Sequence, residues 1–276
     1  MFLYYGGFFT YKEDLNGYHG QDYMGIGQFA FLGVAVVAIV LLCIFLRKIS
    51  HKKIDVLLKV LAIAIPVLEV TKIVVETVCD INHGHGFNYS GLMPLYTCSL
   101  FIYVLPIAAF AKGKVREIAL SFLTTMSIFA GLTNFVMAAI LQYYPFFNFH
   151  TFVSLHFHFW MTFLGVFLIS TKYYVPKWKD ALIGLIPLFV LSLIVVPVNY
   201  IFKFDYMFFY RGDGAPLLPD ISKFFANIKI LGISLRPIYT LFVYLIYMII
   251  NAIIVGIVRL ICFIKHNTES KRSSVN

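Results

Sequence analysis

The chain has 276 residues, of which 61% are hydrophobic and only 13% are charged, whereas about 25% of the residues of an ordinary soluble domain are charged. Its mean hydropathy is +0.86. A folded chain of this size cannot bury so much apolar surface, so lipid has to cover it. The composition excludes a cytosolic enzyme, a secreted domain and a disordered protein, and it indicates a multispan membrane protein. The net charge of +9 therefore does not predict a nucleic-acid partner.

Long apolar runs predict the helices in chain order. A membrane-spanning helix needs about 20 largely apolar residues, and seven stretches of the sequence meet that length. They are residues 26–46, 55–79, 94–111, 118–143, 150–171, 181–201 and 239–264. We therefore expect an all-α bundle of seven transmembrane helices over residues 26–264. An extracytoplasmic segment of residues 1–25 precedes it, residues 203–236 form an outer loop, and residues 265–276 form a tail.

Basic residues between the runs predict the orientation in the membrane. Lys and Arg concentrate in cytoplasmic loops, and here they follow the first, third, fifth and seventh runs. These residues are Arg47, Lys48, Lys52, Lys53, Lys112, Lys114, Arg116, Lys172, Lys177, Lys179, Lys265, Lys271 and Arg272. We expect a multi-pass cell-membrane protein with its N-terminus outside and its C-terminus in the cytoplasm.

Three ionisable residues interrupt the second apolar run. Glu69, Lys72 and Glu76 are spaced i, i+3 and i+7, so they lie on one face of a helix. An ionisable side chain inside a span costs about 2.5 to 3.5 kcal/mol on insertion, and by default it marks a function. The stripe is either a structural ion pair or the wall of a site. The second carboxylate favours a site, because a pair needs only one.

Histidines form a polar face on the fifth predicted helix. His150, Ser154, His158 and Thr162 recur every four residues and share one side of the helix. His156 lies about 200° around the helix from His158. We therefore expect His158 to face the bundle, and His156 to face lipid or a neighbouring helix.

Successive helices run in opposite directions through the membrane. With a rise of about 1.5 Å per residue, several polar residues of different helices then lie at the same depth, in the outer half of the bilayer. They are Glu76, Cys98, Asn134, His158 and Asn199. We expect a polar cavity that opens toward the outer leaflet or the exterior, under the loop of residues 203–236. The predicted cavity residues are Glu69, Lys72, Asn134, His150 and Asn199.

Three chemistries fit these residues. A cysteine near an imidazole can act as a nucleophile, with Cys98 attacking, His158 as general base and Glu76 orienting the ring, although a buried cysteine also serves as packing. The stripe of the second helix could instead bind an ion or proton in a transporter. A metal site from Asp80, His83 and His85 is a weaker alternative. The chain has no Gly-rich phosphate loop, HExxH or GxSxG motif, and we expect no cofactor.

Several stretches resemble the YwaF-like bacterial integral membrane proteins. They are Gly91-Leu-Met-Pro-Leu-Tyr-Thr-Cys98-Ser-Leu-Phe-Ile-Tyr103, the helix with His158, and Asn199-Tyr-Ile-Phe followed by Asp205-Tyr-Met-Phe. The resemblance extends over nearly the whole chain and includes the number of helices. Those proteins are similar to a eukaryotic membrane cysteine acyltransferase that remodels polyunsaturated ether phospholipids, and more distantly to intramembrane lipid hydrolases of the androgen-induced type.

The resemblance implies that the cysteine of the family falls on Cys98 and its histidine on His158 or His156. It also implies membrane lipids as partners. We therefore predict a membrane protein whose outer cavity handles a lipid or acyl chain, as a Cys/His-dependent acyltransferase or lipid hydrolase. An ion- or proton-coupled small-molecule transporter that uses Glu69, Lys72 and Glu76 is the alternative.

Overall fold

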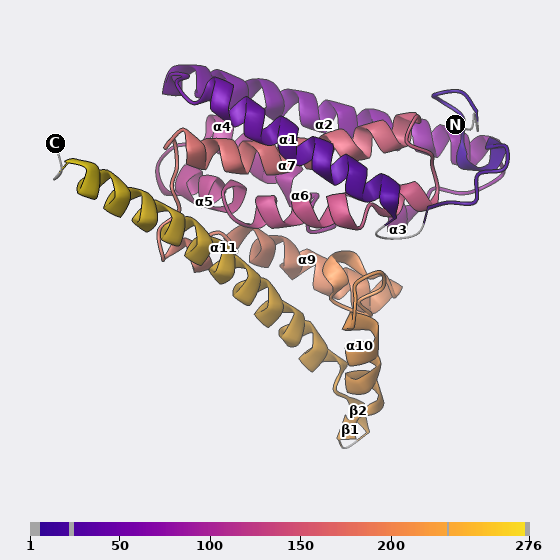
Figure 1. The fold of residues 1–276 in the computed structure, drawn as a ribbon. Helices are drawn as coiled ribbons and strands as arrows, with labels where there is room; N and C mark the ends of the chain where they lie inside the picture. The colour runs from indigo at the N-terminus through magenta and orange to yellow at the C-terminus, as the bar shows by residue number, and fades with distance from the viewer. Residues whose placement is uncertain (1–5, 22–24, 231, 274–276) are drawn as a thin grey trace.

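The structure is a computed structural model that describes residues 6–21, 25–230 and 232–273. Helices make up most of the described chain and run side by side in a bundle (Figure 1). The prediction of an all-α fold is therefore confirmed. Residues 1–5, 22–24 and 274–276, which belong to the predicted N-terminal segment and tail, lie outside the described residues.

The elements follow one another from the N-terminal segment to a long last helix. The α-helices are α1 (Ile26–Leu46), α2 (His51–Asn82), α3 (Tyr89–Leu92), α4 (Leu100–Phe110), α5 (Gly113–Leu123), α6 (Met126–Val136), α7 (Phe149–Ser170), α8 (Asp180–Ile183), α9 (Ile186–Phe202), α10 (Leu218–Asn227) and α11 (Arg236–Ser273). The 3-10 helices are η1 (Lys12–Asp14), η2 (Ala139–Gln142) and η3 (Tyr206–Phe208). A short antiparallel hairpin pairs β1 (Lys229–Ile230) with β2 (Ile233–Ser234).

Five stretches of the described chain are long and apolar enough to cross a membrane. They are Ile26–Leu46, Gly113–Gln142, Phe149–Ser170, Asp180–Phe202 and Arg236–Lys265. The 32-residue helix α2 has the length, but it carries several charges, and the apolar α4 has only 11 residues. The structure therefore supports a multi-pass membrane protein, and the seven-helix count stays a prediction.

The loops divide between the two ends of the bundle. The N-terminal segment, the α2–α4 connection and residues 203–217 gather at one end, which we call the N-terminal end (Figure 1). The α1–α2 turn and the C-terminus lie at the other end. The two ends match the two sets of loops that the basic residues separate, and which end faces the cytoplasm stays a prediction.

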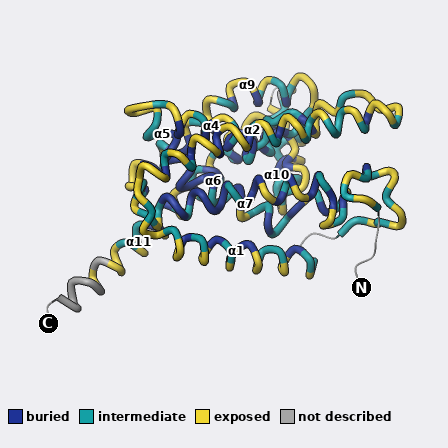
Figure 2. Tube along the Cα trace, turned by 90° about the horizontal axis from the view of Figure 1, so that it is seen from above, coloured by how far each residue is buried: buried dark blue, intermediate teal, exposed yellow. Residues whose placement is uncertain are grey.

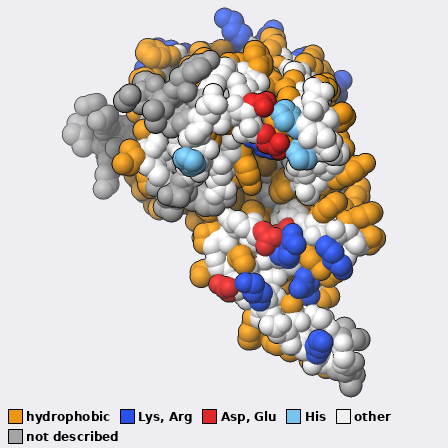
Figure 3. Space-filling view, turned by 90° about the vertical axis from the view of Figure 1, so that its right-hand side faces the viewer, with side chains coloured by type: hydrophobic (Ala, Val, Ile, Leu, Met, Phe, Trp, Pro, Cys, Tyr) orange, Lys and Arg blue, Asp and Glu red, His pale blue; other side chains and the backbone are white. Residues whose placement is uncertain are grey.

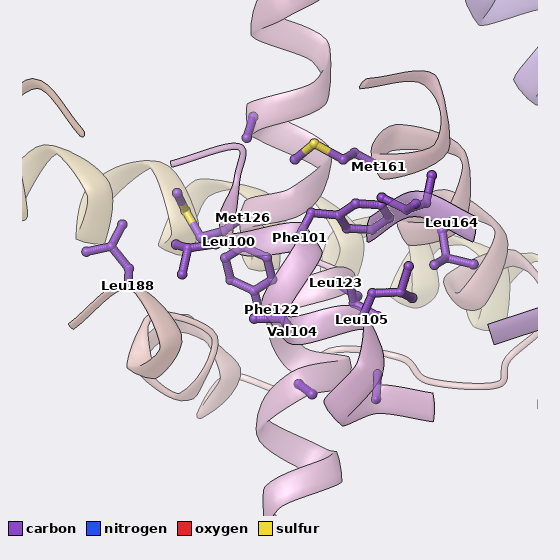
Figure 4. Packing of buried hydrophobic residues seen from close by; sticks show 14 of the residues in the cluster. Leu100, Phe101, Val104, Leu105, Phe122, Leu123, Met126, Met161, Leu164 and Leu188 are labelled. Carbon is purple, nitrogen blue, oxygen red and sulfur yellow. The ribbon is translucent and has the colours of Figure 1, made fainter. Parts of the chain in front are cut away.

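The apolar core lies where α4, α5, α6 and α7 meet. Phe101, Phe122 and Met126 are fully buried there, as are Met161 and Leu164 of α7 (Figure 4). Helix α7 lies at the centre of the bundle, and 61% of the residues in its most apolar 18-residue stretch are buried. Helix α1 lies at the edge, and only 17% of the residues in the corresponding stretch are buried (Figure 2). The apolar outer faces of the peripheral helices are therefore left for lipid.

Two glycines let α6 and α7 approach closely. A Cβ on Gly131 of α6 would lie 2.1 Å from Thr162 Oγ1 and 2.8 Å from the His158 carbonyl oxygen. A Cβ on Gly165 of α7 would lie 2.4 Å from Ile128 Cγ1 of α6 and 2.4 Å from the Leu123 carbonyl oxygen at the end of α5. Small residues at helix contacts permit this approach in membrane bundles. The contact sets the position of the α7 backbone around His158.

The structure divides the predicted helix of residues 118–143. Helix α5 ends at Leu123 and α6 begins at Met126. Between them, Thr124 Oγ1 donates to the Leu120 carbonyl at 2.8 Å, and Thr125 Oγ1 donates to the Ser121 carbonyl at 2.8 Å. Threonine hydroxyls that donate hydrogen bonds to backbone carbonyls of their own helix compete with the helical hydrogen bonds, and the helix can end there.

The third predicted helix, expected from residue 94, begins only at Leu100. Pro94 disfavours a helical conformation of the residue before it, and Met93 is extended, with φ −65° and ψ 126°. Cys98 was therefore wrongly expected one turn inside a helix, because it lies in the turn that precedes α4. Helix α11 is longer than expected and continues through the predicted tail to Ser273.

Candidate functional site

A cavity of about 480 Å³ lies at the N-terminal end, between α6, α7, α11 and the loop that contains η3. Its polar wall includes Thr97, Cys98, Thr133, Asn134, His158 and Tyr247. Its apolar wall includes Phe129, Ala130, Met137, Ile246 and Ile250. The structure thus brings three of the sequence-predicted site residues, Cys98, Asn134 and His158, to one cavity.

Cys98 is held in place by contacts of its own turn. The Cys98 carbonyl accepts the Phe101 N–H at 3.0 Å, and the neighbouring Thr97 Oγ1 lies 2.7 Å from the Tyr247 hydroxyl. Tyr247 of α11 also donates to the Met207 carbonyl at 3.2 Å. The turn is therefore tied to both α11 and η3, and Cys98 as a residue is half-buried.

His158 faces the cavity from the middle of α7. It is 6% exposed, and its Nδ1 lies 2.7 Å from the Ser154 carbonyl. A carbonyl can only accept, so Nδ1 donates and a neutral ring keeps its lone pair on Nε2. His156 is exposed and contacts the Phe152 carbonyl at 3.1 Å. The two histidines therefore face as the helical spacing predicts.

The predicted outer loop contributes to the cavity wall through Phe208 and residues 213–216. Met207 and Phe208 adopt left-handed φ values of 57° and 59°, which are uncommon for residues other than glycine. Asn199 holds this segment, because its Nδ2 donates to the Tyr206 carbonyl at 2.8 Å and its Oδ1 accepts the Tyr206 N–H at 3.0 Å. Asn199 was expected to line the cavity, but it is fully buried and supports the loop instead.

Asp205 organises the same loop. Its carboxylate accepts the backbone N–H groups of Tyr210, Arg211 and Asp213 at 2.9, 2.8 and 2.7 Å. Burial raises the pKa of Asp205 above its ordinary value, and these hydrogen bonds lower it by less. The carboxylate is therefore a fixed acceptor that shapes the loop over the cavity.

Glu69 and Lys72 form a pair on α2. Lys72 Nζ lies 2.5 Å from Glu69 Oε1, as the structural reading of the stripe expects. Glu69 and Lys72 were expected to line the cavity, but neither residue is on its wall.

Glu76 belongs to a different set of contacts. Its Oε2 lies 2.8 Å from His150 Nδ1, without hydrogen-bond alignment, and its oxygens accept the Tyr144 hydroxyl at 3.3 and 3.4 Å. Lys12 Nζ lies 3.6 Å from Glu76 Oε1. The structure joins Glu76 and His150, two predicted site residues, to each other and not to His158.

Residues 23–272 match the model of the TMEM164 family, from the start of α1 to the end of α11. The chain belongs to the TMEM164 family. No curated protein and no solved structure matches it. The family match and the apolar helices together identify an integral membrane protein.

The two histidines that follow α2 in this TMEM164-family chain, His83 and His85, pair with acids of the N-terminal segment. His83 Nε2 lies 3.2 Å from Asp14, and His85 Nε2 lies 2.8 Å from Glu13 Oε1. Among the residues that the structure describes, no group of three or more His, Cys, Asp or Glu side chains is placed to hold a metal ion. The alternative of a metal site at Asp80, His83 and His85 therefore finds no support.

Sequence reasoning missed three residues of these sites, namely Lys12, Tyr144 and Tyr247. Tyr247 meets Thr97 across 150 positions, and Tyr144 meets Glu76 across 68. Neither tyrosine carries a local pattern that separates it from the other aromatic residues of an apolar chain. The sequence shows only that Lys12 is a basic residue in an acidic segment, and this does not identify the residues that it contacts.

Proposed function

We propose that this member of the TMEM164 family is a Cys/His-dependent lipid acyltransferase or lipid hydrolase. Cys98 is the nucleophile and His158 is the general base. The observation that carries the proposal is that both side chains lie on the wall of one largely apolar cavity. The resemblance of the Cys98 and His158 regions to YwaF-like proteins, and through them to a membrane cysteine acyltransferase, supports the same assignment.

The reaction proceeds in two halves. His158 Nε2 accepts the Cys98 thiol proton, and the thiolate attacks the ester carbonyl of a lipid. The ester C–O bond breaks, a thioester forms on Cys98, and the departing alcohol takes the proton from His158. In the second half, His158 deprotonates a hydroxyl group that attacks the thioester, and the thiol is restored. A lipid hydroxyl gives acyl transfer, and water gives hydrolysis.

The residues around the pair fit these steps. The Ser154 carbonyl holds Nδ1 of His158, so the ring presents its Nε2 lone pair without a carboxylate. This contact takes the orienting role that the sequence suggested for Glu76. Phe129, Met137 and Ile246 supply an apolar wall for an acyl chain, whose burial stabilises binding by about 0.8 kcal/mol per methylene.

The test is lipid turnover in proteoliposomes that contain the full chain and a labelled phospholipid. We expect Cys98→Ala and His158→Ala each to lower acyl transfer and hydrolysis by about 10² to 10⁴-fold, with unchanged expression. Cys262→Ala and His156→Ala are matched controls, because neither residue lines the cavity. Wild-type turnover in Cys98→Ala would exclude the mechanism.

The transporter alternative makes the opposite prediction. If Glu69 and Glu76 bind a coupling ion, Glu69→Gln or Glu76→Gln stops ion-coupled uptake, and Cys98→Ala has no effect. In the structure Glu69 is paired with Lys72, and Glu76 lies near Lys12. We therefore favour the acyl chemistry at Cys98.

A further inference from the structure

The N-terminal segment, residues 6–21, docks across the ends of α2 and α7. The Phe8 carbonyl accepts the Phe149 N–H at 2.7 Å, and the Thr10 carbonyl accepts Asn148 Nδ2 at 2.8 Å. This docking places Lys12 between two carboxylates of α2. Its Nζ lies 3.6 Å from Glu76 Oε1 and 3.6 Å from Asp80 Oδ1.

We call the set of titratable side chains around this ammonium the Lys12 cluster. Its members are Tyr11, Lys12, Glu76, Asp80, Tyr144 and His150. They come from the N-terminal segment, from α2, from the turn before α7 and from α7 itself. Figure 3 shows acidic side chains and histidines on the surface at the N-terminal end, whereas Asp80 and His150 of the cluster are buried. The residues of the Cys98 cavity are not among them, so the cluster is a separate site.

The cluster has one carboxylate more than its single lysine balances. Asp80 is 3% exposed and His150 is 2% exposed, so the surplus charge is held largely away from water. With a neutral His150 the cluster carries a net charge of about −1, and with an imidazolium it is neutral. Burial disfavours net charge. The uptake of one positive charge therefore stabilises the cluster.

Two atoms are placed to receive that charge. Asp80 Oδ2 is buried and has no hydrogen-bond partner in the part of the chain that the structure describes, although the Tyr11 hydroxyl donates to the other oxygen. His150 Nδ1 lies 2.8 Å from Glu76 Oε2, and its ring stacks on Tyr144 at 4.5 Å between centroids. A proton on His150 Nδ1 gains the Glu76 carboxylate as an anionic neighbour, and a proton on Asp80 Oδ2 removes the charge of a buried carboxylate.

We propose that the Lys12 cluster is a proton-binding site, in which one proton and the tethered ammonium of Lys12 neutralise the same two carboxylates and, as like charges, weaken each other's binding. The bound proton belongs to the cluster and not to one residue, because its members titrate together. Proton binding weakens the hold on Lys12, and withdrawal of Lys12 strengthens proton binding by the same factor.

Other titratable groups face the cluster and set its surroundings. They are Glu13, Asp14 and Tyr18 of the N-terminal segment, and Cys79, His83 and His85 at the end of α2. The bond to the Cys79 carbonyl, followed by Asp14, raises the pKa of His83. Protonation of His83 strengthens its pair with Asp14. The segment is therefore kept attached under the conditions in which the bound proton weakens the hold on Lys12.

Lys12 remains charged when the Lys12 cluster binds a proton. Burial lowers the pKa of Lys12, but the Tyr11 hydroxyl and the Glu76 charge raise it by more, so it lies above its ordinary value. The two like charges are therefore a permanent tethered cation and a proton from the solution at the N-terminal end. The site senses the pH on that side of the membrane, independently of turnover at Cys98.

The test is a titration of the full chain in nanodiscs with ¹⁵N-labelled histidine, followed by NMR between about pH 5 and pH 9. His150→Gln identifies the His150 signals by their loss. In the wild type we expect the His150 ring to titrate. Lys12→Met, which keeps the length of the side chain without the charge, moves the midpoint up by about one pH unit, a tenfold gain in proton affinity.

Lys203→Met is the matched control, because Lys203 lies at the same end of the bundle and contacts the Tyr200 carbonyl instead of the cluster. It should leave the midpoint unchanged. Glu76→Gln removes the surplus carboxylate and should move the midpoint down, so it tests the proposal even if Lys12→Met does not fold. An unchanged midpoint in the folded Lys12 and Glu76 variants, or a His150 ring that does not titrate, would overturn the proposal.

A sodium ion is the competing occupant for a negative site. The same titration at low and high NaCl, with choline chloride holding the ionic strength constant, separates the two. A His150 midpoint that is independent of sodium supports the proton site. A response to sodium without a response to pH would replace the proton by a metal cation and contradict the proposal.

Discussion

Helix α7 presents one histidine to each of two different regions. His150 and His158 lie about 12 Å apart along the helix axis, and both are buried. His158 meets a backbone carbonyl and an apolar cavity, whereas His150 meets the Glu76 carboxylate close to Lys12 and Asp80. The difference teaches that the partner sets the chemistry of a buried imidazole. One imidazole therefore meets a neutral hydrogen-bond acceptor, and the other meets an anionic carboxylate.

The two regions also differ in how the chain builds them. Transmembrane helices and the strained loop at Met207 form the cavity, and the docked N-terminal segment completes the Lys12 cluster. If the regions are independent, a change in one should leave the other intact. The following variants test that separation, beginning with the largest expected effect.

Asn199→Ala should damage the cavity most. It removes both hydrogen bonds to Tyr206 and leaves a buried backbone N–H and carbonyl without their partner, at about 1 to 3 kcal/mol for each group. We expect a lower midpoint of thermal unfolding and faster amide exchange over residues 205–213, with an unchanged N-terminal segment. The exposed Asn227→Ala is the control. Loss of protection in residues 6–21 as well would show that the regions are coupled.

Gly131→Ala should disturb the contact of α6 with α7. The added methyl group would meet Thr162 Oγ1 at 2.1 Å and the His158 carbonyl at 2.8 Å, and overpacking of this kind costs about 1 to 3 kcal/mol. We expect a lower midpoint of thermal unfolding and a lower rate of lipid turnover. Gly33→Ala, with no atom within 4 Å of the new Cβ, should leave both unchanged. Equal stability of the two variants would contradict the close approach.

Tyr247→Phe should loosen the turn that holds Cys98. The hydroxyl contacts Thr97 Oγ1 and the Met207 carbonyl, and the loss of such bonds costs about 1 kcal/mol net. We expect faster alkylation of Cys98 by a small thiol reagent, counted by mass spectrometry. Tyr244→Phe, whose hydroxyl contacts Ser192, is the control. Slower or unchanged alkylation would mean that Tyr247 does not hold the turn.

His83→Gln should have the smallest effect, confined to the docking of the N-terminal segment. The pKa of His83 is raised in the folded chain. Its contribution to docking is therefore complete below its ordinary pKa of about 6.5 and disappears as the pH rises through the higher folded pKa. Amide exchange of residues 6–21 measures this, and the variant should remove the part of the pH dependence that His83 contributes. His51→Gln at the opposite end should retain it.

Local chemistry was predictable wherever one helix decides it. The apolar runs identify a membrane bundle, and helical spacing buries His158 and exposes His156. The same spacing places Glu69 beside Lys72, which the structure joins at 2.5 Å. These features depend on residues within one or two turns of each other, whose geometry is the same in every α-helix.

Features that depend on a competing local bond were less predictable. The helix breaks at Thr124 and Thr125, where the threonine hydroxyls donate to carbonyls of the preceding turn. Threonine makes such bonds in some helices and not in others. The late start of α4 follows from Pro94 and from an extended Met93. Hydropathy alone cannot place either boundary, because a largely apolar stretch continues on both sides of it.

By itself, the sequence determined the solvent of this protein, its all-α class and the helix faces of His156 and His158. Only the tertiary structure decided the partners. It placed Cys98 and His158 on the wall of one cavity, paired Glu76 with His150, and put Lys12 between two carboxylates. The physical reason is that periodicity orients a side chain on its own helix, whereas the neighbour it meets depends on how distant segments pack, and the Lys12 contacts span more than sixty residues.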